Sequence, residues 1–382
     1  MGVHENFRTS RGMEKIPVLD RKSQLNLERL LKFLNEKRDV RILLARTDRI
    51  GDVVLSIPLI KILKKRFPSS YIGFMVRPYT KDLLEGNPYL DKVLVYDKYN
   101  RHHSLKGSLE FLKTLKRERF DLSLILHPTN RAHILCFLAR IPFRIGYDIK
   151  MGFLNNIILP HTKQEGKMHE LEYNLQFLKL LEMQTDEIDF FIPLKKEEEA
   201  LHILEKNRLL NKKIIFVNPT ASCISKIWPP EYFASLINSI KSAFPQYHII
   251  LVGLSDKKEL LERLKHNLKF EVLDLVGKTD LSLLASLLKR GFLFISCDSG
   301  PVHIASSLGI RCVVIFGRKQ KGLSPQRWKP WGKRHIILHK DVGCKECLAH
   351  NCKNDFLCLK SIKPQEVFDK IKDILGKEEK DE

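Results

Sequence analysis

The stretch Phe292-Leu293-Phe294-Ile295-Ser296-Cys297-Asp298-Ser299-Gly300-Pro301-Val302-His303 runs from an apolar segment into a turn that opens a helix. Its continuous apolar run is typical of a strand in a parallel sheet that is covered on both faces. Gly300 allows the backbone to approach a ligand closely, and Pro301 suits the first position of a helix. The amides at the start of that helix would face an anion beside the strand, which predicts a phosphate site. An ordinary helix cap followed by a structural histidine explains the turn equally well when it is taken alone.

Strands and helices alternate along the chain on both sides of this turn. In the C-terminal half, strands are expected at 213–217, 248–252, 272–276, 292–296 and 312–316, with helices at 230–244, 256–266, 281–289 and 301–308. In the N-terminal half, strands are expected at 41–45, 71–76, 92–96, 121–126 and 144–147, with a helix at 53–66. This alternation predicts an α/β protein of two doubly wound, Rossmann-like domains, each built on a parallel sheet.

The pattern divides the chain into four segments. Residues 1–39 are an N-terminal extension with an amphipathic helix at 22–38, which docks either on the protein or on an anionic membrane surface. Residues 40–190 and 191–360 are the two Rossmann-like domains. Residues 361–382 are a C-terminal helix, expected to pack back across the first domain, and a polar tail.

The composition favours a protein that binds anions. The chain has 382 residues and a formal net charge of +21, which suits phosphorylated substrates, acidic lipid or nucleic acid. From Ser299 to Lys340 it has nine Lys or Arg and no Asp or Glu. This basic tract directly follows the predicted phosphate site, although a solvated basic face is the alternative. No apolar run is long enough to span a membrane and the start lacks the apolar core of a secretory signal, so we expect a cytoplasmic protein.

The first predicted strand ends in Arg46-Thr47-Asp48-Arg49-Ile50-Gly51-Asp52-Val53. Neither a G-x-G-x-x-G fingerprint nor a G-x-x-x-x-G-K-[ST] loop occurs at a strand end, which disfavours a Rossmann dehydrogenase and a P-loop kinase. Gly51 allows a tight turn, and Asp52 then opens a helix. Asp52 is either an N-cap carboxylate or a general base that takes a proton from an acceptor hydroxyl.

Small hydroxyl residues and one lysine follow the first strand of the second domain, in Asn218-Pro219-Thr220-Ala221-Ser222 and Ser225-Lys226-Ile227-Trp228-Pro229. They offer amide, hydroxyl and ammonium groups that bind phosphate oxygens. A surface lysine is the alternative for Lys226. The predicted phosphate site therefore combines Thr220, Ser222, Ser225 and Lys226 with Asp298, Ser299, Gly300 and His303.

The eight cysteines form two groups. Single cysteines in or near apolar segments are expected to be small buried residues, namely Cys136, Cys223, Cys297 and Cys312. The others cluster in one loop-like tract, at Cys344, Cys347, Cys352 and Cys358. Cys344-x2-Cys347 is typical of a zinc or redox site, but the second pair has no standard spacing. Free thiols or adventitious disulfides are therefore favoured over a structural metal, and no metal ligand is assigned.

Taken together, four motifs resemble the heptosyltransferases of lipopolysaccharide core assembly, glycosyltransferase family 9. They are the segment 46–52, Arg144-Ile145-Gly146-Tyr147, Asn218-Pro219 with Lys226-x-Trp228-Pro229, and Asp298-Ser299-Gly300-Pro301-x-His303. The resemblance spans about residues 40–375. It implies a GT-B fold, in which two Rossmann-like domains face each other across a cleft. Residues 40–190 would bind the acceptor, and residues 191–360 would bind the nucleotide-sugar.

The resemblance also implies an inverting, single-displacement transfer that requires no cofactor, Mg²⁺ being allowed but not obligatory. Asp52 matches the family's base, Lys226 matches its lysine for the diphosphate, and the segment 298–303 matches its sugar-donor loop. The usual sugar donor is ADP-L-glycero-β-D-manno-heptose, and the usual acceptor is an acidic glycolipid, Kdo-lipid A or its heptosylated core. This acceptor implies a peripheral contact with anionic lipid on the cytoplasmic face of the inner membrane. The predicted acceptor residues are Arg49, Gly51, Arg131 and Arg144, with the basic tract Arg101-His102-His103 beside them.

Two positions depart from the family's pattern. Asp48 and Arg49 replace small residues before the Gly-Asp pair, and Gly317-Arg318-Lys319 replaces a common Gly-Pro-Thr. The second departure concerns the contacts of the nucleotide and therefore the identity of the sugar donor. Three other hypotheses stay open: a GT-B transferase with another nucleotide-sugar, a non-catalytic basic binding protein, and a nucleic-acid-binding protein. The last lacks any zinc-finger, RNP or helix-turn-helix signature, so no specific nucleic acid is expected.

Overall fold

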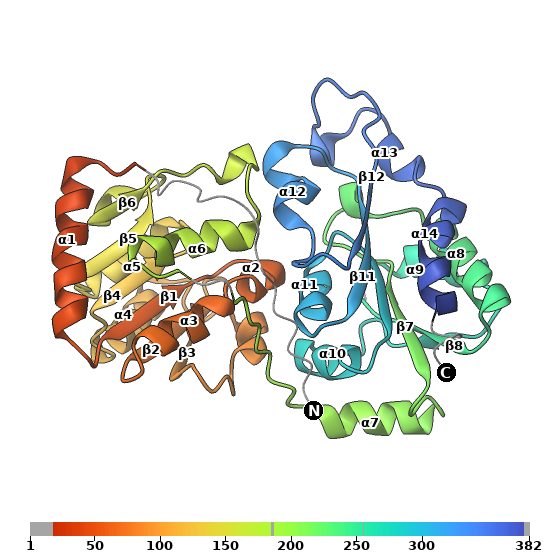
Figure 1. Ribbon diagram of the computed structural model, residues 1–382, viewed down its shortest axis with the longest axis horizontal. Coiled ribbons are helices and arrows are strands. Elements are labelled where there is room, and N and C mark those ends of the chain that lie inside the picture. Colours follow the sequence, from red (N-terminus) through yellow and green to blue (C-terminus); the bar gives the residue numbers. More distant parts are fainter. Residues whose placement is uncertain (1–17, 185–186, 255, 378–382) are drawn as a thin grey trace. The chain divides into compact units, whose positions relative to one another are not determined.

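Each half of the chain folds around a parallel sheet of six strands (Figure 1). The computed structural model describes residues 18–184, 187–254 and 256–377. The described residues divide into two compact units. The first lies within Met1–Gln164 and Met168–Pro193, and the second within Glu165–Lys167 and Leu194–Glu382. The N-terminal seventeen residues of the predicted extension and the end of the predicted polar tail lie outside the described residues.

The sheet of the first unit has the strand order β3-β2-β1-β4-β5-β6. Its strands are β1 (Arg41–Ala45), β2 (Tyr71–Val76), β3 (Lys92–Val95), β4 (Leu122–Ile125), β5 (Phe143–Tyr147) and β6 (Ile157–Leu159). Its α-helices are α1 (Arg21–Glu36), α2 (Ile50–Val54), α3 (Pro58–Arg66), α4 (Leu105–Arg117), α5 (Asn130–Leu138) and α6 (Glu170–Leu180). The 3₁₀ turns are η1 (Pro78–Leu83), η2 (Gly152–Leu154) and η3 (Lys163–Glu165).

The second unit repeats this order as β12-β11-β10-β7-β8-β9. Its strands are β7 (Lys213–Asn218), β8 (Tyr247–Leu251), β9 (Leu273–Asp274), β10 (Leu293–Cys297), β11 (Arg311–Phe316) and β12 (Ile336–His339). Its α-helices are α7 (Glu197–Lys206), α8 (Pro230–Ala243), α9 (Lys258–His266), α10 (Leu281–Leu288), α11 (Gly300–Ser307), α12 (Pro325–Trp328), α13 (Leu357–Lys360) and α14 (Pro364–Lys377). The 3₁₀ turns are η4 (Ile224–Lys226), η5 (Lys321–Leu323) and η6 (Ala349–Asn351).

The strand order of each sheet by itself indicates where a ligand binds. In a doubly wound sheet the chain order reverses between two neighbouring strands, and ligands bind beyond the carboxyl ends of those strands. In the first unit this point lies between β1 and β4, and in the second it lies between β7 and β10. The predicted base follows β1, and the predicted phosphate loops follow β7 and β10. The α/β prediction of two doubly wound, parallel sheets is confirmed.

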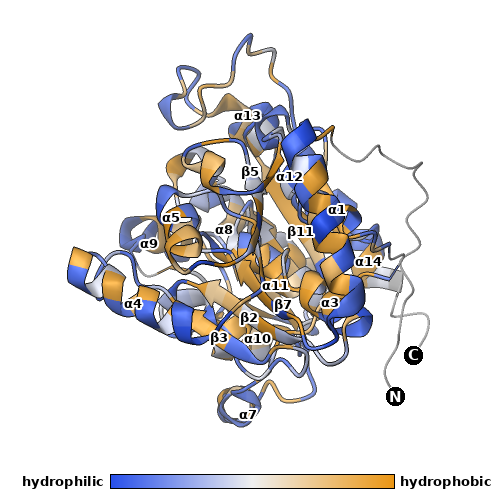
Figure 2. Ribbon diagram, turned by 90° about the vertical axis from the view of Figure 1, so that its left-hand side faces the viewer, coloured by the Kyte–Doolittle hydropathy of each residue, from blue (hydrophilic) through white to orange (hydrophobic). Residues whose placement is uncertain are grey.

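The helices cover the sheets with their apolar sides. In α4, Phe111, Leu112 and Leu115 are buried, whereas the lysines of the helix face solvent. Figure 2 shows hydrophilic and hydrophobic residues alternating along this helix. The predicted helix 53–66 is divided into α2 and α3, because Pro58 lacks the amide that would continue the first helix.

The N-terminal helix α1 docks on the protein through its apolar stripe, which settles one of the two alternatives for it. Leu30 and Leu34 are buried, and the hydroxyl of Ser23 accepts a hydrogen bond from the amide of Ile158 at 3.0 Å. Ile158 lies on β6, the edge strand of its sheet, so α1 covers an edge that would otherwise expose unpaired amides.

The C-terminal helix α14 corrects an expectation. It packs on α8 within the second unit and not across the first, with Val367, Ile371 and Leu375 fully buried. The hydroxyl of Tyr247 donates to the carbonyl of Leu375 at 3.1 Å. Every third or fourth residue of α14 is apolar, and the second unit's own core takes up that stripe completely.

Candidate active site

The end of β7 and the end of β10 are joined by one side chain, Asn218. Its amide oxygen accepts from the backbone amide of Thr220 at 3.1 Å and from the Thr220 hydroxyl at 2.8 Å. Its amide nitrogen donates to the hydroxyls of Ser296 and Ser299, at 3.2 and 3.1 Å. Gly253 has a φ of +141°, and a Cβ there would stand 2.3 Å from the Thr220 hydroxyl. Asn218 thus fixes the two predicted phosphate loops against each other.

Asp298 lies at the centre of an ion triad in front of β10. Its carboxylate stands 3.1 Å from the ammonium of Lys226 and 2.6 Å from the guanidinium of Arg318. Burial disfavours the charged carboxylate, but Lys226 and Arg318 outweigh that effect and lower the pKa of Asp298 below its ordinary value. The triad therefore carries one net positive charge in a nearly buried position, which is the arrangement an anion can compete for.

Buried neighbours hold Lys226 in place. The next residue but one, Trp228, is fully buried, and its indole N–H donates to the carbonyl of Ile362 at 2.9 Å. The amide of Trp228 donates to the sulfur of Cys297 at 3.2 Å, at the end of β10. The motif Lys-x-Trp-Pro thus anchors η4 and directs Lys226 toward Asp298.

The helix α11 presents its first turn at the same place. Ser299 precedes it in extended conformation but makes no side-chain cap, because its hydroxyl bonds to Ser296 and Asn218 instead. His303 is buried in the first turns of this helix, with its ring 6.3 Å from that of Trp328. The N-terminus of α11 thus combines with a cationic triad, which is the composition of a phosphate site.

The remaining predicted phosphate residues take different places. Ser225 is buried, and its hydroxyl lies 3.0 Å from Nδ1 of His350. Ser222 is exposed. Arg318 was not predicted as a site residue and entered only as a departure from the family's pattern. Its Nε is buried and has no hydrogen-bond partner among the described residues.

Asp52 lies in a buried ionic cluster at the end of β1. Arg46, 1% exposed, donates to Asp52 at 2.5 Å, to Glu170 at 2.8 Å and to Asp48 at 3.0 Å. Lys163 stands 2.6 Å from the carboxylate of Glu170. Arg46 also donates to the carbonyl of Leu126 beyond β4 and to the side chain of Asn174, at 3.0 and 3.2 Å. Its five donors are therefore all directed at fixed acceptors, which holds Asp52 rigidly.

The charges of this cluster balance if Asp48 keeps its proton. Burial raises the pKa of Asp48 well above its usual range; Arg46 opposes the rise, and Asp52 and Glu170 add to it. Two cations, Arg46 and Lys163, then face two carboxylates, Asp52 and Glu170. A buried cluster with equal numbers of both charges avoids the cost of an unpaired ion.

His127 packs against the same cluster and is neutral in the folded protein. Its Nδ1 lies 3.8 Å from Asp48, and burial, with a further contribution from Arg46, lowers its pKa to about 3. Unfolding restores the ordinary pKa of about 6.5, so the unfolded chain binds one proton more at any pH between these values. Stability is therefore expected to fall as the pH drops through this window.

We expect a pH drop from 7 to 5 to cost about 1–2 kcal/mol of stability through His127 alone. His127→Gln should remove this part of the pH dependence of the unfolding temperature, because glutamine does not titrate. His202→Gln, at an exposed position of α7, serves as the control and should leave it unchanged. If the unfolding temperature of His127→Gln depended on pH as that of the wild type does, the lowered pKa of His127 would be contradicted.

Two of the predicted acceptor residues lie beside Asp52, and the other two lie elsewhere in the first unit. Gly51 and Arg49 lie in and next to the first turn of α2, beside Asp52. Arg131 donates to the backbone carbonyls of Lys98, His102 and His103, at 3.1 to 3.2 Å, so it braces the loop that contains the basic tract 101–103.

Arg144 lies in β5, where it pairs with Ser123 of β4, and Ser123 pairs in turn with Leu43 in the middle of β1. Its guanidinium donates to the carbonyls of Leu154 and Ile141. The part of Arg144 in acceptor binding stays a prediction.

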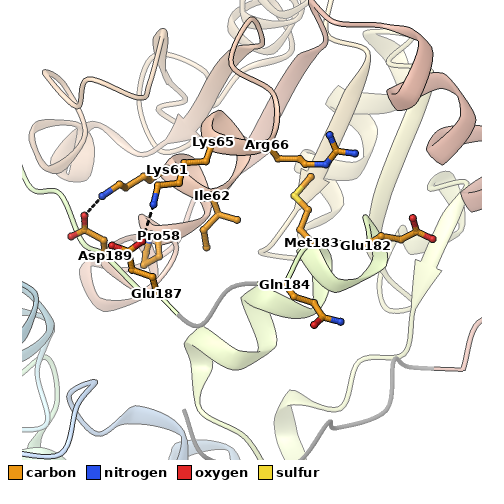
Figure 3. Close-up of a pocket in the computed structure, with 10 residues that line it drawn as sticks. All are labelled: Pro58, Lys61, Ile62, Lys65, Arg66, Glu182, Met183, Gln184, Glu187 and Asp189. Atoms are coloured by element: carbon orange, nitrogen blue, oxygen red, sulfur yellow. Dashed lines mark hydrogen bonds and ion pairs between the residues drawn. The ribbon is translucent and has the colours of Figure 1, made fainter. Parts of the chain in front are cut away.

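A separate cavity of about 310 Å³ lies along α3 in the first unit (Figure 3). Four of its charged groups form two pairs: Lys65 stands 2.8 Å from Glu187, and Lys61 pairs with Asp189. The rest of the lining is Pro58, Ile62, Arg66, Glu182, Met183 and Gln184. The cavity holds none of the residues at the ends of β1 or β4, so it carries no part of the chemistry described above.

Known proteins resemble the chain in sequence. Residues 108–357 match Glycosyltransferase family 9 (heptosyltransferase). Lipooligosaccharide heptosyltransferase 2 of Campylobacter jejuni subsp. jejuni serotype O:6 is 26% identical over 331 residues, which cover 85% of this chain and 95% of the relative. Lipopolysaccharide heptosyltransferase 3 of Escherichia coli K12 is 24% identical over 303 residues, covering 75% of this chain and 84% of the relative.

Solved structures share the fold. A glycosyl transferase of family 9 from Veillonella parvula has a TM-score of 0.78 at 22% identity, over 88% of this chain and 97% of that one. The ADP-heptose LPS heptosyltransferase II of E. coli has a TM-score of 0.71 at 20% identity, over 89% of this chain and 100% of that one. Since the family match spans more than half of the sequence, the chain belongs to glycosyltransferase family 9 and has its GT-B fold.

Proposed function

We propose that the chain transfers a heptose from ADP-L-glycero-β-D-manno-heptose to the inner core of lipopolysaccharide, either Kdo-lipid A or its heptosylated form. Family membership supports heptosyl transfer. Two of the relatives are named as heptosyltransferases of lipooligosaccharide and lipopolysaccharide. The observation that carries the proposal is the triad of Lys226, Asp298 and Arg318 at the N-terminus of α11. A diphosphate needs cations and amides at one place, and the second unit offers both there.

We propose that binding of the nucleotide-sugar rearranges the triad of Lys226, Asp298 and Arg318. The diphosphate competes with Asp298 for Lys226 and Arg318, and the buried Nε of Arg318 gains a partner. Arg318 thereby supplies a charged contact to the diphosphate, at the position of the proline in the family's common Gly-Pro-Thr pattern. The amides of the first turn of α11 and the ring of His303 complete the contacts to the leaving group.

Asp52 is the proposed general base. In a single displacement, its carboxylate takes the proton of an acceptor hydroxyl while that oxygen attacks the anomeric carbon of the heptose. The bond from this carbon to the diphosphate breaks at the same time, ADP leaves with the electron pair, and the configuration inverts. Asp48 keeps its proton, so that before the transfer Arg46 and Lys163 balance the charged Asp52 and Glu170.

The nucleotide-sugar is a substrate here, and no cofactor is part of the proposal. The cationic groups that neutralise the leaving diphosphate are Lys226 and Arg318, and Mg²⁺ is not required for that task.

The acceptor and the membrane contact stay predictions. Arg49 and Gly51 flank Asp52, and we propose them for the acid groups of the acceptor. No helix in the described parts of the chain is long and apolar enough to cross a membrane. Because α1 buries its apolar stripe on the protein, a peripheral contact with anionic lipid on the cytoplasmic face of the inner membrane would use another surface.

Nucleotide binding tests the sugar-donor site separately from turnover. At a concentration 100 times its dissociation constant, ADP should stabilise the protein by about 2.7 kcal/mol, and UDP and GDP by much less. The unfolding temperature with each nucleotide measures this. Arg318→Gln should reduce the shift that ADP causes, whereas Arg290→Gln, at a half-exposed arginine after α10, should not. A larger shift with UDP or GDP than with ADP would contradict the proposed sugar donor.

A further inference from the structure

Four of the eight cysteines line a single cavity of about 440 Å³ in the second unit. They are Cys344, Cys347, Cys352 and Cys358, spaced by two, four and five intervening residues. All four are half-buried free thiols. Lysines line the same cavity, at Lys319, Lys340, Lys345 and Lys353. Cysteine binds metals in its thiolate form.

The four cysteines line the same cavity. Cys358 is within electrostatic range of the other three thiols. Backbone amides of Ala349, Lys319 and Gln320 hydrogen-bond to Cys347, and the side-chain amide of Asn354 donates to the sulfur of Cys344 at 3.1 Å. Hydrogen bonds of this kind orient thiolate ligands around metal centres.

The site is not closed around an ion as it stands. Within residues 18–184, 187–254 and 256–377, no group of three or more His, Cys, Asp or Glu side chains is placed so that it could hold a metal ion. The sulfurs line an open cavity, however, and a cysteine side chain has a single rotatable bond between staggered positions. Rotation about these bonds is the movement that a metal ion would demand.

We propose that Cys344, Cys347, Cys352 and Cys358 bind one transition-metal ion through their four sulfurs. Four thiolates suit zinc or iron, whereas Mg²⁺ and Ca²⁺ prefer oxygen ligands. Four protein ligands leave no open position for a substrate, so the ion is structural. The free thiols favoured by the spacing alone are then the metal-free form of this site.

The cysteine loop contacts the loop after β7 and the segment after β11, which hold Lys226 and Arg318 of the proposed sugar-donor site. His350, between Cys347 and Cys352, bonds to Ser225, the neighbour of Lys226, at 3.0 Å. On the other side, Gly317 and Lys319 line the cavity and flank Arg318, and Lys319 stands 2.8 Å from Asp341. The ion thus holds the loop that positions Lys226 and Arg318. This consequence rests on the proposed function, whereas the metal site itself does not.

Metal analysis of the full chain tests the site. Protein purified without chelators or a metal-affinity tag should contain about one zinc or iron per chain. Cys347→Ser and Cys352→Ser should each lower its affinity for zinc by at least about tenfold, measured by competition with a chromogenic chelator. Cys223→Ser, which changes a half-buried cysteine outside the cavity, should keep the metal. Absorption in the visible range would identify an iron form of the same site.

Two outcomes would overturn the proposal. In the first, the purified wild-type protein contains no metal, and after reduction of its thiols it takes up no more zinc than the Cys352→Ser variant does. The second is pairing of these cysteines as disulfides in the natively purified protein, detected by mass spectrometry. A titration with ADP separates the consequence from the site. If removal of the metal weakens ADP binding, the bracing role holds. If the protein contains the metal but binds ADP neither with it nor after its removal, the proposed function fails and the metal site stands.

Discussion

Asp52→Asn is expected to lower kcat by about 10²–10⁴-fold, the usual contribution of a general base, while the affinity for ADP stays within about twofold. Asparagine keeps the shape of the side chain and still accepts the hydrogen bond from Arg46, but it cannot take a proton. Asp52 lies in the first unit, whereas the proposed diphosphate contacts lie in the second, so nucleotide binding is expected to be independent of this change. Steady-state kinetics and an ADP titration measure the two effects.

Asp48→Asn is the matched control, because it changes a second carboxylate on the same arginine. Since Asp48 is proposed to keep its proton, the neutral amide resembles its working form, and kcat should stay within about tenfold of the wild type. The reverse result, with Asp48→Asn inactive and Asp52→Asn active, would assign the base to Asp48. Full activity in both variants would remove the general base from the mechanism.

Arg46→Met is expected to destabilise the first unit by about 3–5 kcal/mol, because it leaves buried carboxylates without their cation. Arg46 binds Asp48, Asp52 and Glu170 at once, and Lys163 would be left as the cation described beside them. For a unit of this size, such a loss lowers the unfolding temperature by roughly 10 °C. Scanning calorimetry resolves this if the two units unfold in separate transitions.

Arg49→Met, three residues further and exposed, tests whether any lost arginine has this effect. It should change the unfolding temperature by no more than about 2 °C, as surface substitutions usually do. A second variant, Glu170→Gln, should be less destabilising than Arg46→Met, because it leaves Arg46 paired with Asp52 and Asp48. Equal stability of Arg46→Met and the wild type would show that the buried cluster is not a balanced ionic network.

The sequence predicted the fold well because both sheets are parallel and buried. Strands such as β10 are continuous apolar runs, and the strands β7 to β10 are each followed by a helix that the sequence predicts. The sixth strands, β6 and β12, escaped prediction because three or four residues at a sheet edge carry little pattern. The position of α14 escaped as well, since an amphipathic stripe shows that a helix packs but not on which surface.

The candidate site was predictable where its residues are local. Asp298 directly follows β10, and Lys226 and Asp52 lie in the segments that follow β7 and β1. Strand ends are where such sheets bind ligands. Arg46 was visible in the same motif, but its role depends on Glu170, which is distant in the sequence and gives no local signal. In the sequence, Arg318 stood out only because Gly317-Arg318-Lys319 departs from the family's common Gly-Pro-Thr. Its contact with Asp298 depends on the neighbouring positions of β10 and β11 in the sheet, which one strand's pattern does not give.

One assay tests the central claim most directly: transfer from ADP-L-glycero-β-D-manno-heptose, compared with UDP- and GDP-sugars, to Kdo-lipid A and to heptosylated core. We expect ADP release coupled to heptose transfer with inverted anomeric configuration, onto one of these two acceptors. We expect no transfer from the UDP- or GDP-sugars. Turnover with one of those, and none with ADP-heptose, would contradict the proposed function.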